Sequence, residues 1–228
     1  GHPMLLYLIN PDNPVVGITK LTWSRLNRFR LMKPLSLLTI AGLSPRDWTV
    51  KVIDENLGGV DYRSLLPPDL VGITAFTSQA TRAYELASFF RARGTPVVIG
   101  GIHATMCLDE ALQYADAVVT GEAESVWRTV LEDVEKGSLQ RVYRGGLSTM
   151  ETIPLARHDL LPDGFHAGSV QTARGCPLRC TFCSVTAFNG GTYRLRRIAD
   201  VIAELRQIRE RRIFFVDDNM IGTRRDHI

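Results

Sequence analysis

Five short apolar segments alternate with stretches of helical periodicity along the first part of the chain, and this alternation restricts the possible fold most. The apolar segments are residues 4–9, 49–53, 70–75, 96–100 and 117–120, and the helical stretches are residues 34–43, 79–93, 108–114 and 122–136. Buried strands separated by helices form parallel sheets with right-handed connections and helices on both faces. The sequence therefore predicts an α/β fold with a doubly wound, five-stranded, Rossmann-like parallel sheet, whose ligand binds beyond the carboxyl ends of its strands.

A second, smaller unit is expected after a linker. Prolines and glycines interrupt residues 137–167, and the periodicity weakens there, which is typical of a connecting segment. Residues 169–173 and 213–216 predict two further buried strands, and residues 198–210 predict a helix. The apolar face of this helix comprises Ile198, Val201, Ile202, Leu205 and Ile208. The expected organisation is a first domain over residues 4–136, a linker over residues 137–167 and a second unit over residues 168–228.

Three of the four cysteines lie in one loop, RGCPLRCTFC at residues 174–183, with the spacing C-x3-C-x2-C. A cubane [4Fe–4S] cluster usually takes four thiolates, so three thiolates from one loop leave one iron open. That iron can chelate the amino and carboxylate groups of S-adenosylmethionine, whose reductive cleavage gives a 5′-deoxyadenosyl radical. Structural zinc sites usually pair two C-x2–4-C knuckles, and here the fourth cysteine, Cys107, lies across the linker. Zinc binding and a redox pair are the alternatives.

This loop, which follows a short strand and has an aromatic residue before its last cysteine, resembles the radical S-adenosylmethionine superfamily. The resemblance implies that Cys176, Cys180 and Cys183 bind a [4Fe–4S] cluster at the start of a partial (β/α) barrel over residues 168–228. It also implies that Phe182 packs near the adenine of S-adenosylmethionine. Core packing of Phe182 beside the cluster is an equal alternative.

The residues after the second expected strand of this unit are Asp217-Asp218-Asn219. Members of the superfamily often have a glycine-rich turn at this place for the methionyl amino group, and the Asp-Asp-Asn ending resembles that of cobalamin-type members. The resemblance assigns Asp217, Asp218 and Asn219 to S-adenosylmethionine, since a carboxylate at a strand end suits an ammonium group. A polar turn or a helix cap is the alternative.

The first domain resembles the cobalamin-binding subclass of the same superfamily. The residues assigned to cobalamin are Thr74, Thr77, Ser78, Gly100, Gly101, His103, Gly121 and Glu122. The glycines let the backbone approach a large flat ligand, and the hydroxyls suit a nucleotide tail. His103 is explained equally well as a satisfied loop histidine, and Glu122 as a carboxylate in the first turn of a helix.

The loop after the first strand contains no histidine, so the resemblance implies cobalamin without a histidine from that loop on its cobalt. Loss of cobalamin from the domain is the other explanation. Pro11 and Pro14 stand where a dinucleotide-binding G-x-G-x-x-G needs glycines, whereas a flavodoxin-like domain is possible on architecture alone. Residues 20–33, with Arg25, Arg28 and Arg30, are expected to form a solvated helix face or a cover for the corrin.

The resulting expectation is a cobalamin-dependent radical S-adenosylmethionine enzyme that methylates an unactivated carbon. Oxidative cyclisation or rearrangement is the alternative within the subclass, and a non-catalytic cobalamin or cluster carrier lies outside it. The expected partners are a small-molecule substrate and an electron donor of the flavodoxin or ferredoxin type.

Charge and length complete these expectations. A net charge of +3 is too small to indicate nucleic acid. No apolar run reaches the ~18 residues of a membrane span, and no signal peptide is evident, so the expected location is the cytoplasm. Only 45 residues follow Cys183, which predicts an incomplete barrel in a fragment of a longer enzyme.

Overall fold

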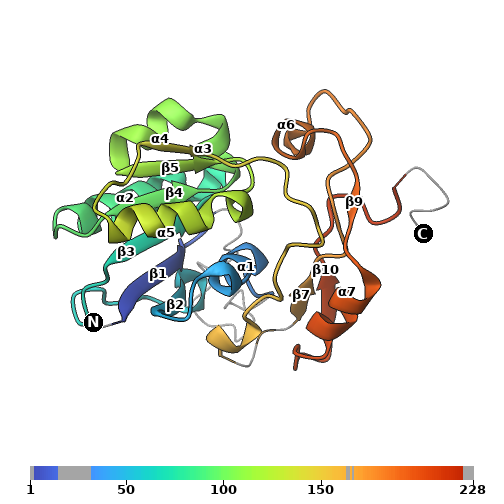
Figure 1. The fold of residues 1–228 in the computed structure, drawn as a ribbon, viewed down its shortest axis with the longest axis horizontal. Helices are drawn as coiled ribbons and strands as arrows, with labels where there is room; N and C mark the ends of the chain where they lie inside the picture. The colour runs from blue at the N-terminus through green and yellow to red at the C-terminus, as the bar shows by residue number, and fades with distance from the viewer. Residues whose placement is uncertain (1–2, 15–31, 163–164, 166, 223–228) are drawn as a thin grey trace.

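The computed structural model describes residues 3–14, 32–162, 165 and 167–222, and the larger part of these folds around a six-stranded parallel sheet (Figure 1). The strands are β1 (Met4–Asn10), β2 (Trp48–Asp54), β3 (Leu70–Thr74), β4 (Val97–Gly100), β5 (Ala117–Thr120) and β6 (Val142–Arg144). They follow the order β2-β1-β3-β4-β5-β6, and every neighbouring pair is parallel. The strand order reverses between β1 and β3, and ligands of such sheets bind in the crevice at that switch point.

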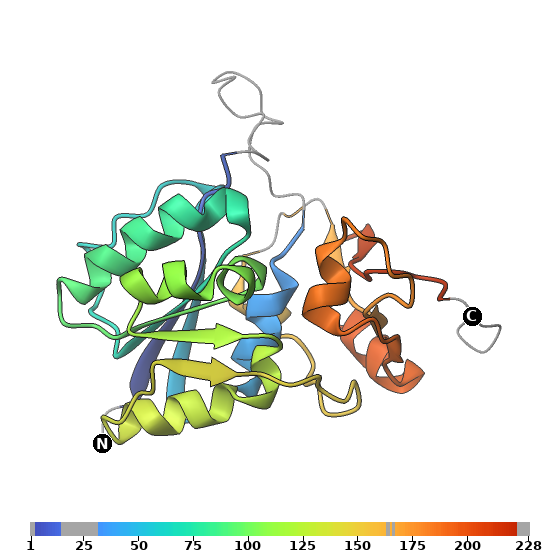
Figure 2. The same cartoon turned by 90° about the horizontal axis from the view of Figure 1, so that it is seen from above.

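Helices cover both faces of the sheet, as Figure 2 shows. One face packs against α1 (Leu35–Leu43) and α5 (Trp127–Glu135), and the other packs against α2 (Ala80–Arg91), α3 (Ile102–Met106) and α4 (Leu108–Tyr114). Successive side chains of a strand point to opposite faces, so a strand that is covered on both sides needs a continuous apolar run. β1 has such a run.

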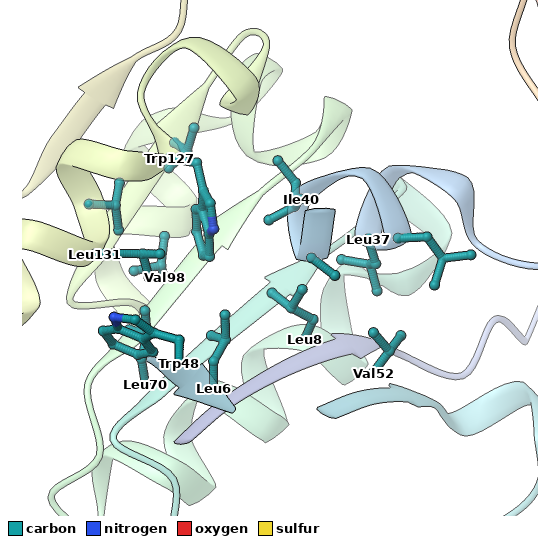
Figure 3. Close-up of a cluster of buried hydrophobic side chains, with 14 of the residues drawn as sticks. Leu6, Leu8, Leu37, Ile40, Trp48, Val52, Leu70, Val98, Trp127 and Leu131 are labelled. Carbon is teal, nitrogen blue, oxygen red and sulfur yellow. The ribbon is translucent and has the colours of Figure 1, made fainter. Parts of the chain in front are cut away.

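The apolar residues of β1 divide between the two cores. Leu6 and Leu8 belong to the core under α1 and α5, where Trp48 and Trp127 also lie (Figure 3). Tyr7 and Ile9 belong to the core under α2. This alternation explains why β1 lies inside the sheet and not at its edge.

The predicted α/β fold of the sheet domain is confirmed with two additions, while the partial barrel stays a prediction. All five predicted strands form with small shifts at their ends, but β6 adds a sixth strand. β6 lies in the segment expected to be a linker, where Val142 pairs with Val118. Three residues are too few to show a strand periodicity, which is why the sequence did not predict it. The short helix α3, directly after Gly101, was also not expected.

The smaller part of the described chain contains two short strand pairs and two helices. β7 (Gly168–Val170) pairs in parallel with β10 (Ile213–Phe215), and β8 (Ala173–Arg174) pairs in antiparallel fashion with β9 (Arg194–Leu195). The helices are α6 (Ser184–Asn189) and α7 (Ile198–Leu205). The predicted strand at residues 169–173 is therefore divided into β7 and β8, and the predicted helix at residues 198–210 ends at Leu205.

The apolar residues of this smaller part are less buried than the sequence predicts. Ile198 in α7 is 77% exposed and Ile202 is also exposed. Phe214 and Phe215 in β10 are exposed as well, so the prediction of a buried strand there is wrong. Among the described residues β10 pairs only with β7, so its other edge leaves backbone N–H and C=O groups unpaired.

The buried residue of α7 is an acid, Glu204, because two basic side chains meet it. Arg196 Nη2 lies 2.9 Å from Glu204 Oε2, and His158 Nε2 lies 3.4 Å from Oε1. His158 belongs to a short 3-10 helix within the expected linker, so that part of the linker packs against α7. Burial by itself raises the pKa of Glu204. The hydrogen bond with His158 and the charge of Arg196 outweigh burial and hold that pKa below its usual range.

We expect Glu204 to make the fold sensitive to acid. Because its folded pKa lies below the unfolded value of about 4.3, its contribution to stability is fully present above that value. This contribution is lost as the pH falls through the lower, folded pKa. Urea unfolding between about pH 6 and about pH 3 should show a steeper loss of stability for the wild type than for Glu204→Gln, which cannot titrate. Parallel pH profiles of the two proteins would contradict this expectation.

Two further expectations concern whole segments. Most of the basic stretch at residues 20–33, including its three arginines, lies outside the described residues. Within the described chain, no helix has the length and apolar character that crossing a membrane requires, and α2, at 12 residues, is far too short.

Candidate functional site

The loops after β3 and β4 meet at the carboxyl edge of the sheet. Thr74 is paired with Gly100, and Gly101 follows with a φ of 92°, in the left-handed region. A Cβ on Gly101 would lie 2.8 Å from Thr74 Oγ1 and 3.2 Å from backbone atoms of Ala75. The close approach of the two loops therefore requires glycine at position 101. A Cβ on Gly100 would meet only Val119, at an ordinary 3.7 Å.

His103 lies buried just inside α3, and two side chains form hydrogen bonds with its ring. Its Nδ1 is 3.3 Å from Thr77 Oγ1, and its Nε2 is 2.9 Å from Tyr84 Oη. Both ring nitrogens are therefore occupied within the domain, which favours the satisfied histidine over a donor to the ligand. Thr77 is exposed and Ser78 is half-buried, so both hydroxyls lie near the surface at the carboxyl edge.

Gln79 connects the loop after β1 with the loop after β3, a role that sequence reasoning missed. Its side-chain nitrogen donates to Asn10 Oδ1 at 2.9 Å and to the Pro11 carbonyl at 2.6 Å, while its Oε1 accepts from the Phe76 amide at 3.0 Å. Because these loops border the switch point of the sheet, Gln79 fixes both walls of the expected ligand crevice. A single glutamine before a helix gives no sequence signal for such a role.

Glu122 is buried after β5 and binds two arginines of the smaller part. Its Oε2 accepts from Arg174 Nη1 and Arg194 Nη1, both at 3.1 Å, and from the Ser148 amide at 2.8 Å. Its Oε1 accepts from Arg194 Nη2. Burial alone raises the pKa of Glu122. The Arg194 hydrogen bond, the Ser148 amide and the Arg174 charge outweigh burial and hold that pKa below its usual range.

Glu124 adds a second carboxylate, whose Oε1 lies 2.7 Å from Arg174 Nη2. We call Glu122, Glu124, Arg174 and Arg194 the two-arginine contact. Because Arg174 is two residues before Cys176, this contact joins the carboxyl edge of the sheet to the start of the cysteine loop. The sequence did not predict the roles of the two arginines, since they follow from a meeting of distant segments.

Gly121 is explained by packing inside the sheet domain. Its φ is 70°, and a Cβ there would overlap the carbonyl oxygen of Gly145, just after β6. Its amide donates to Thr105 Oγ1 at 3.0 Å. The glycine therefore lets the chain turn from β5 into Glu122, and its role toward cobalamin stays a prediction.

The turn after β10 fastens the strand that leads into the cysteine loop. Asp217 Oδ1 accepts from the amides of Thr172 and Ala173 at 2.7 and 3.1 Å. Asp218 Oδ2 accepts from the Gly175 amide at 2.8 Å. Both carboxylates thus accept hydrogen bonds from backbone amides, which agrees with the alternative of a polar turn. Any contact with S-adenosylmethionine would use their remaining lone pairs.

The three loop cysteines are free thiols near the surface. Cys180 is exposed, Cys176 and Cys183 are half-buried, and Asn219 Nδ2 lies 3.5 Å from Cys176 Sγ. Phe182 is 91% exposed, so its ring has no cover from the described residues, and both roles given to it beside a cluster stay predictions.

This donor set fits a cluster better than a single ion. Each thiolate of a cubane binds a different iron, whereas the ligands of one zinc ion converge on a single point. Within the described residues, the three loop thiols do not form a group with all ligand atoms within 4.8 Å of one another. Cys176, Cys180 and Cys183 would hold three irons and leave the fourth to S-adenosylmethionine.

Comparison with known proteins agrees with this description. The model of the B12 binding domain matches residues 31–131. The chain is 32% identical over 200 residues to Bacteriochlorophyllide d C-12(1)-methyltransferase of Chlorobaculum tepidum, with 82% of this chain and 44% of that protein covered. It is 27% identical over 172 residues to the Anaerobic magnesium-protoporphyrin IX monomethyl ester cyclase of Rubrivivax gelatinosus, with 61% of this chain and 31% of that protein covered.

A solved structure shares the fold. It is the radical S-adenosylmethionine methyltransferase TsrM from Kitasatospora setae, with cobalamin and a [4Fe–4S] cluster bound. The TM-score is 0.68 at 18% identity, and the match covers 95% of this chain and 48% of TsrM. The chain thus spans less than half of the length of each of these proteins.

The fold and the matched domain define the class as a B12-binding α/β domain followed by a cysteine-loop unit. The chain belongs to the family that its sequence resembles, the cobalamin-binding radical S-adenosylmethionine proteins.

Proposed function

We propose that this chain is part of an enzyme that methylates an unactivated carbon, with cobalamin at the carboxyl edge of the sheet and a [4Fe–4S] cluster on the cysteine loop. The observation that carries the proposal is the two-arginine contact, which ties the residues before Cys176 to the end of β5. Two cofactors that act on one substrate must lie near each other. The methyltransferase relatives support methyl transfer as the reaction.

The residues of the chain have separate tasks in this proposal. When bound, the cluster and S-adenosylmethionine supply a radical and cobalamin carries the methyl group. Asp217 and Asp218 hold the cysteine loop through backbone amides, and Asn219 donates a hydrogen bond toward Cys176 Sγ. Phe182 offers an exposed aromatic surface to the adenine.

Cobalamin would lie over the loops after β3, β4 and β5. Gly100 has space for a close ligand, and Thr74, Thr77 and Ser78 lie at the same edge. A small-molecule substrate and a flavodoxin or ferredoxin electron donor complete the proposal. A second candidate reaction is oxidative cyclisation, which the similarity to the Rubrivivax cyclase favours.

Cobalamin bound to this chain is expected to be base-off, with no protein histidine on its cobalt. His103 follows β4 and not β1, and its buried ring lies against Thr77 and Tyr84 inside the domain. Absorption and electron paramagnetic resonance spectra of bound cob(II)alamin should therefore be the same for the wild type and His103→Ala. A histidine-ligated spectrum that disappears in His103→Ala would refute this expectation. Failure of the anaerobically purified chain to bind any cobalamin would refute the proposed function.

A further inference from the structure

A second group of metal-ligating side chains lies between α3 and α4, away from the cysteine loop. His103 lies in α3, Glu110 lies in α4, and Cys107 is the residue between the two helices. One ligand atom from each residue lies within 4.8 Å of the others. The proposed function uses neither Cys107 nor Glu110.

The distances suit a tetrahedral ion of the size of zinc. Bonds of 2.0–2.3 Å to zinc imply separations of ~3.3–3.8 Å between ligand atoms. His103 Nε2 and Glu110 Oε1 are already 3.6 Å apart. Closing the rest of the group to this geometry requires movements of about 1 Å, which side-chain rotations can supply.

The backbone holds Cys107 at the junction of the two helices. Its amide donates to the His103 carbonyl at 2.8 Å, and its carbonyl accepts from the Ala111 amide at 3.0 Å. Cys107 therefore caps both helices, four residues after His103 and three residues before Glu110. The Glu110 side chain is 53% exposed, which gives an ion a path from solvent.

The surroundings of His103 orient its ring as in metal sites. Ligating histidines usually donate their second ring N–H to a nearby acceptor, which fixes the tautomer. Thr77 Oγ1, 3.3 Å from Nδ1, can accept that proton and leave Nε2, which lies near Glu110, without a proton. The Tyr84 hydroxyl is hydrogen-bonded to Nε2 at 2.9 Å, so it must give up this hydrogen bond when an ion binds there.

We propose that His103, Cys107 and Glu110 bind one zinc-class divalent cation, with water or the Tyr84 hydroxyl as the fourth ligand. A set of one nitrogen, one thiolate and one carboxylate oxygen suits zinc, whereas magnesium and calcium prefer oxygen alone. The ion would clamp α3 to α4 directly behind the Gly100–Gly101 turn. The site does not depend on the proposed function.

Cobalt(II) is the probe that tests this site, because a thiolate ligand gives it a near-ultraviolet charge-transfer band. Replacing Cys176, Cys180 and Cys183 together with alanine leaves Cys107 as the single cysteine of the chain. This variant, shown to be folded by circular dichroism, should bind one equivalent of cobalt(II) with that band. Adding Cys107→Ser should abolish the band, and adding Glu110→Gln should weaken binding tenfold or more. Asp109→Asn, a neighbouring acid outside the group, is the matched control and should change nothing.

Absence of the band in the folded triple variant, or its survival in Cys107→Ser, would overturn the proposal. If the triple variant does not fold, zinc titration of the intact, iron-free chain decides the question. Cys107→Ser should then lower the number of tightly bound zinc ions by one relative to wild type. An unchanged number would overturn the proposal as well.

Discussion

Replacing any one of Cys176, Cys180 and Cys183 with alanine is expected to abolish stable iron loading. The wild type should bind about four irons per chain after anaerobic reconstitution, since a cubane contains four. The three thiols are the only cysteines on the loop, so loss of one leaves two irons without a protein ligand. Iron and sulfide analysis together with the absorption spectrum of the reconstituted protein measure this loss.

Cys107→Ala is the matched control for the cluster, because Cys107 lies between α3 and α4 and not on the loop. It should bind as much iron as the wild type. Tight zinc without iron in the carefully prepared wild type would rule out the radical chemistry proposed for this chain. Full iron loading in two of the three loop variants would show that the cluster has other ligands.

Glu122→Gln is expected to lower the free energy of unfolding by about 3 kcal/mol, through loss of one partner of a buried ion pair. Glutamine keeps the shape of the side chain but cannot neutralise Arg174 and Arg194. This value lies at the low end of the range for such losses, because the two arginine side chains retain 13% and 17% exposure. Urea unfolding at neutral pH measures this change in stability. The iron content after reconstitution should also fall, because Arg174 lies two residues before Cys176.

Glu124→Gln also removes a carboxylate that contacts Arg174, and it is therefore the matched control for Glu122→Gln. Arg174 keeps its contact with Glu122 in that variant, so the expected loss is about 1 kcal/mol, the cost of one hydrogen bond. Equal losses in the free energy of unfolding for the two variants would show that Glu122 contributes no more to stability than Glu124. A Glu122→Gln protein as stable as the wild type would show that the two parts do not depend on this contact.

The sequence alone determined the class of the sheet domain and the location of the cysteine loop. Strands such as residues 4–9 are continuous apolar runs. Such runs can be recognised in a sequence, because a strand that is buried on both faces excludes polar residues. Cys176, Cys180 and Cys183 are close in sequence, so their spacing needed no tertiary information. The sequence assigned Gly101 to the approach of cobalamin, which stays a prediction, whereas the structure explains the glycine by the nearness of Thr74 and Ala75.

Contacts between distant segments were decided only by the tertiary structure. Glu122 has the sequence signature of a helix first turn, yet its partners are Arg174 and Arg194, more than fifty residues away. Periodicity predicted that Ile198 and Ile202 would be buried in α7, but the residue that is buried there is Glu204, which forms an ion pair with Arg196 and contacts His158. Local patterns report which residues avoid water, whereas the pairing of buried charges depends on which surfaces meet, and only the folded chain brings those surfaces together.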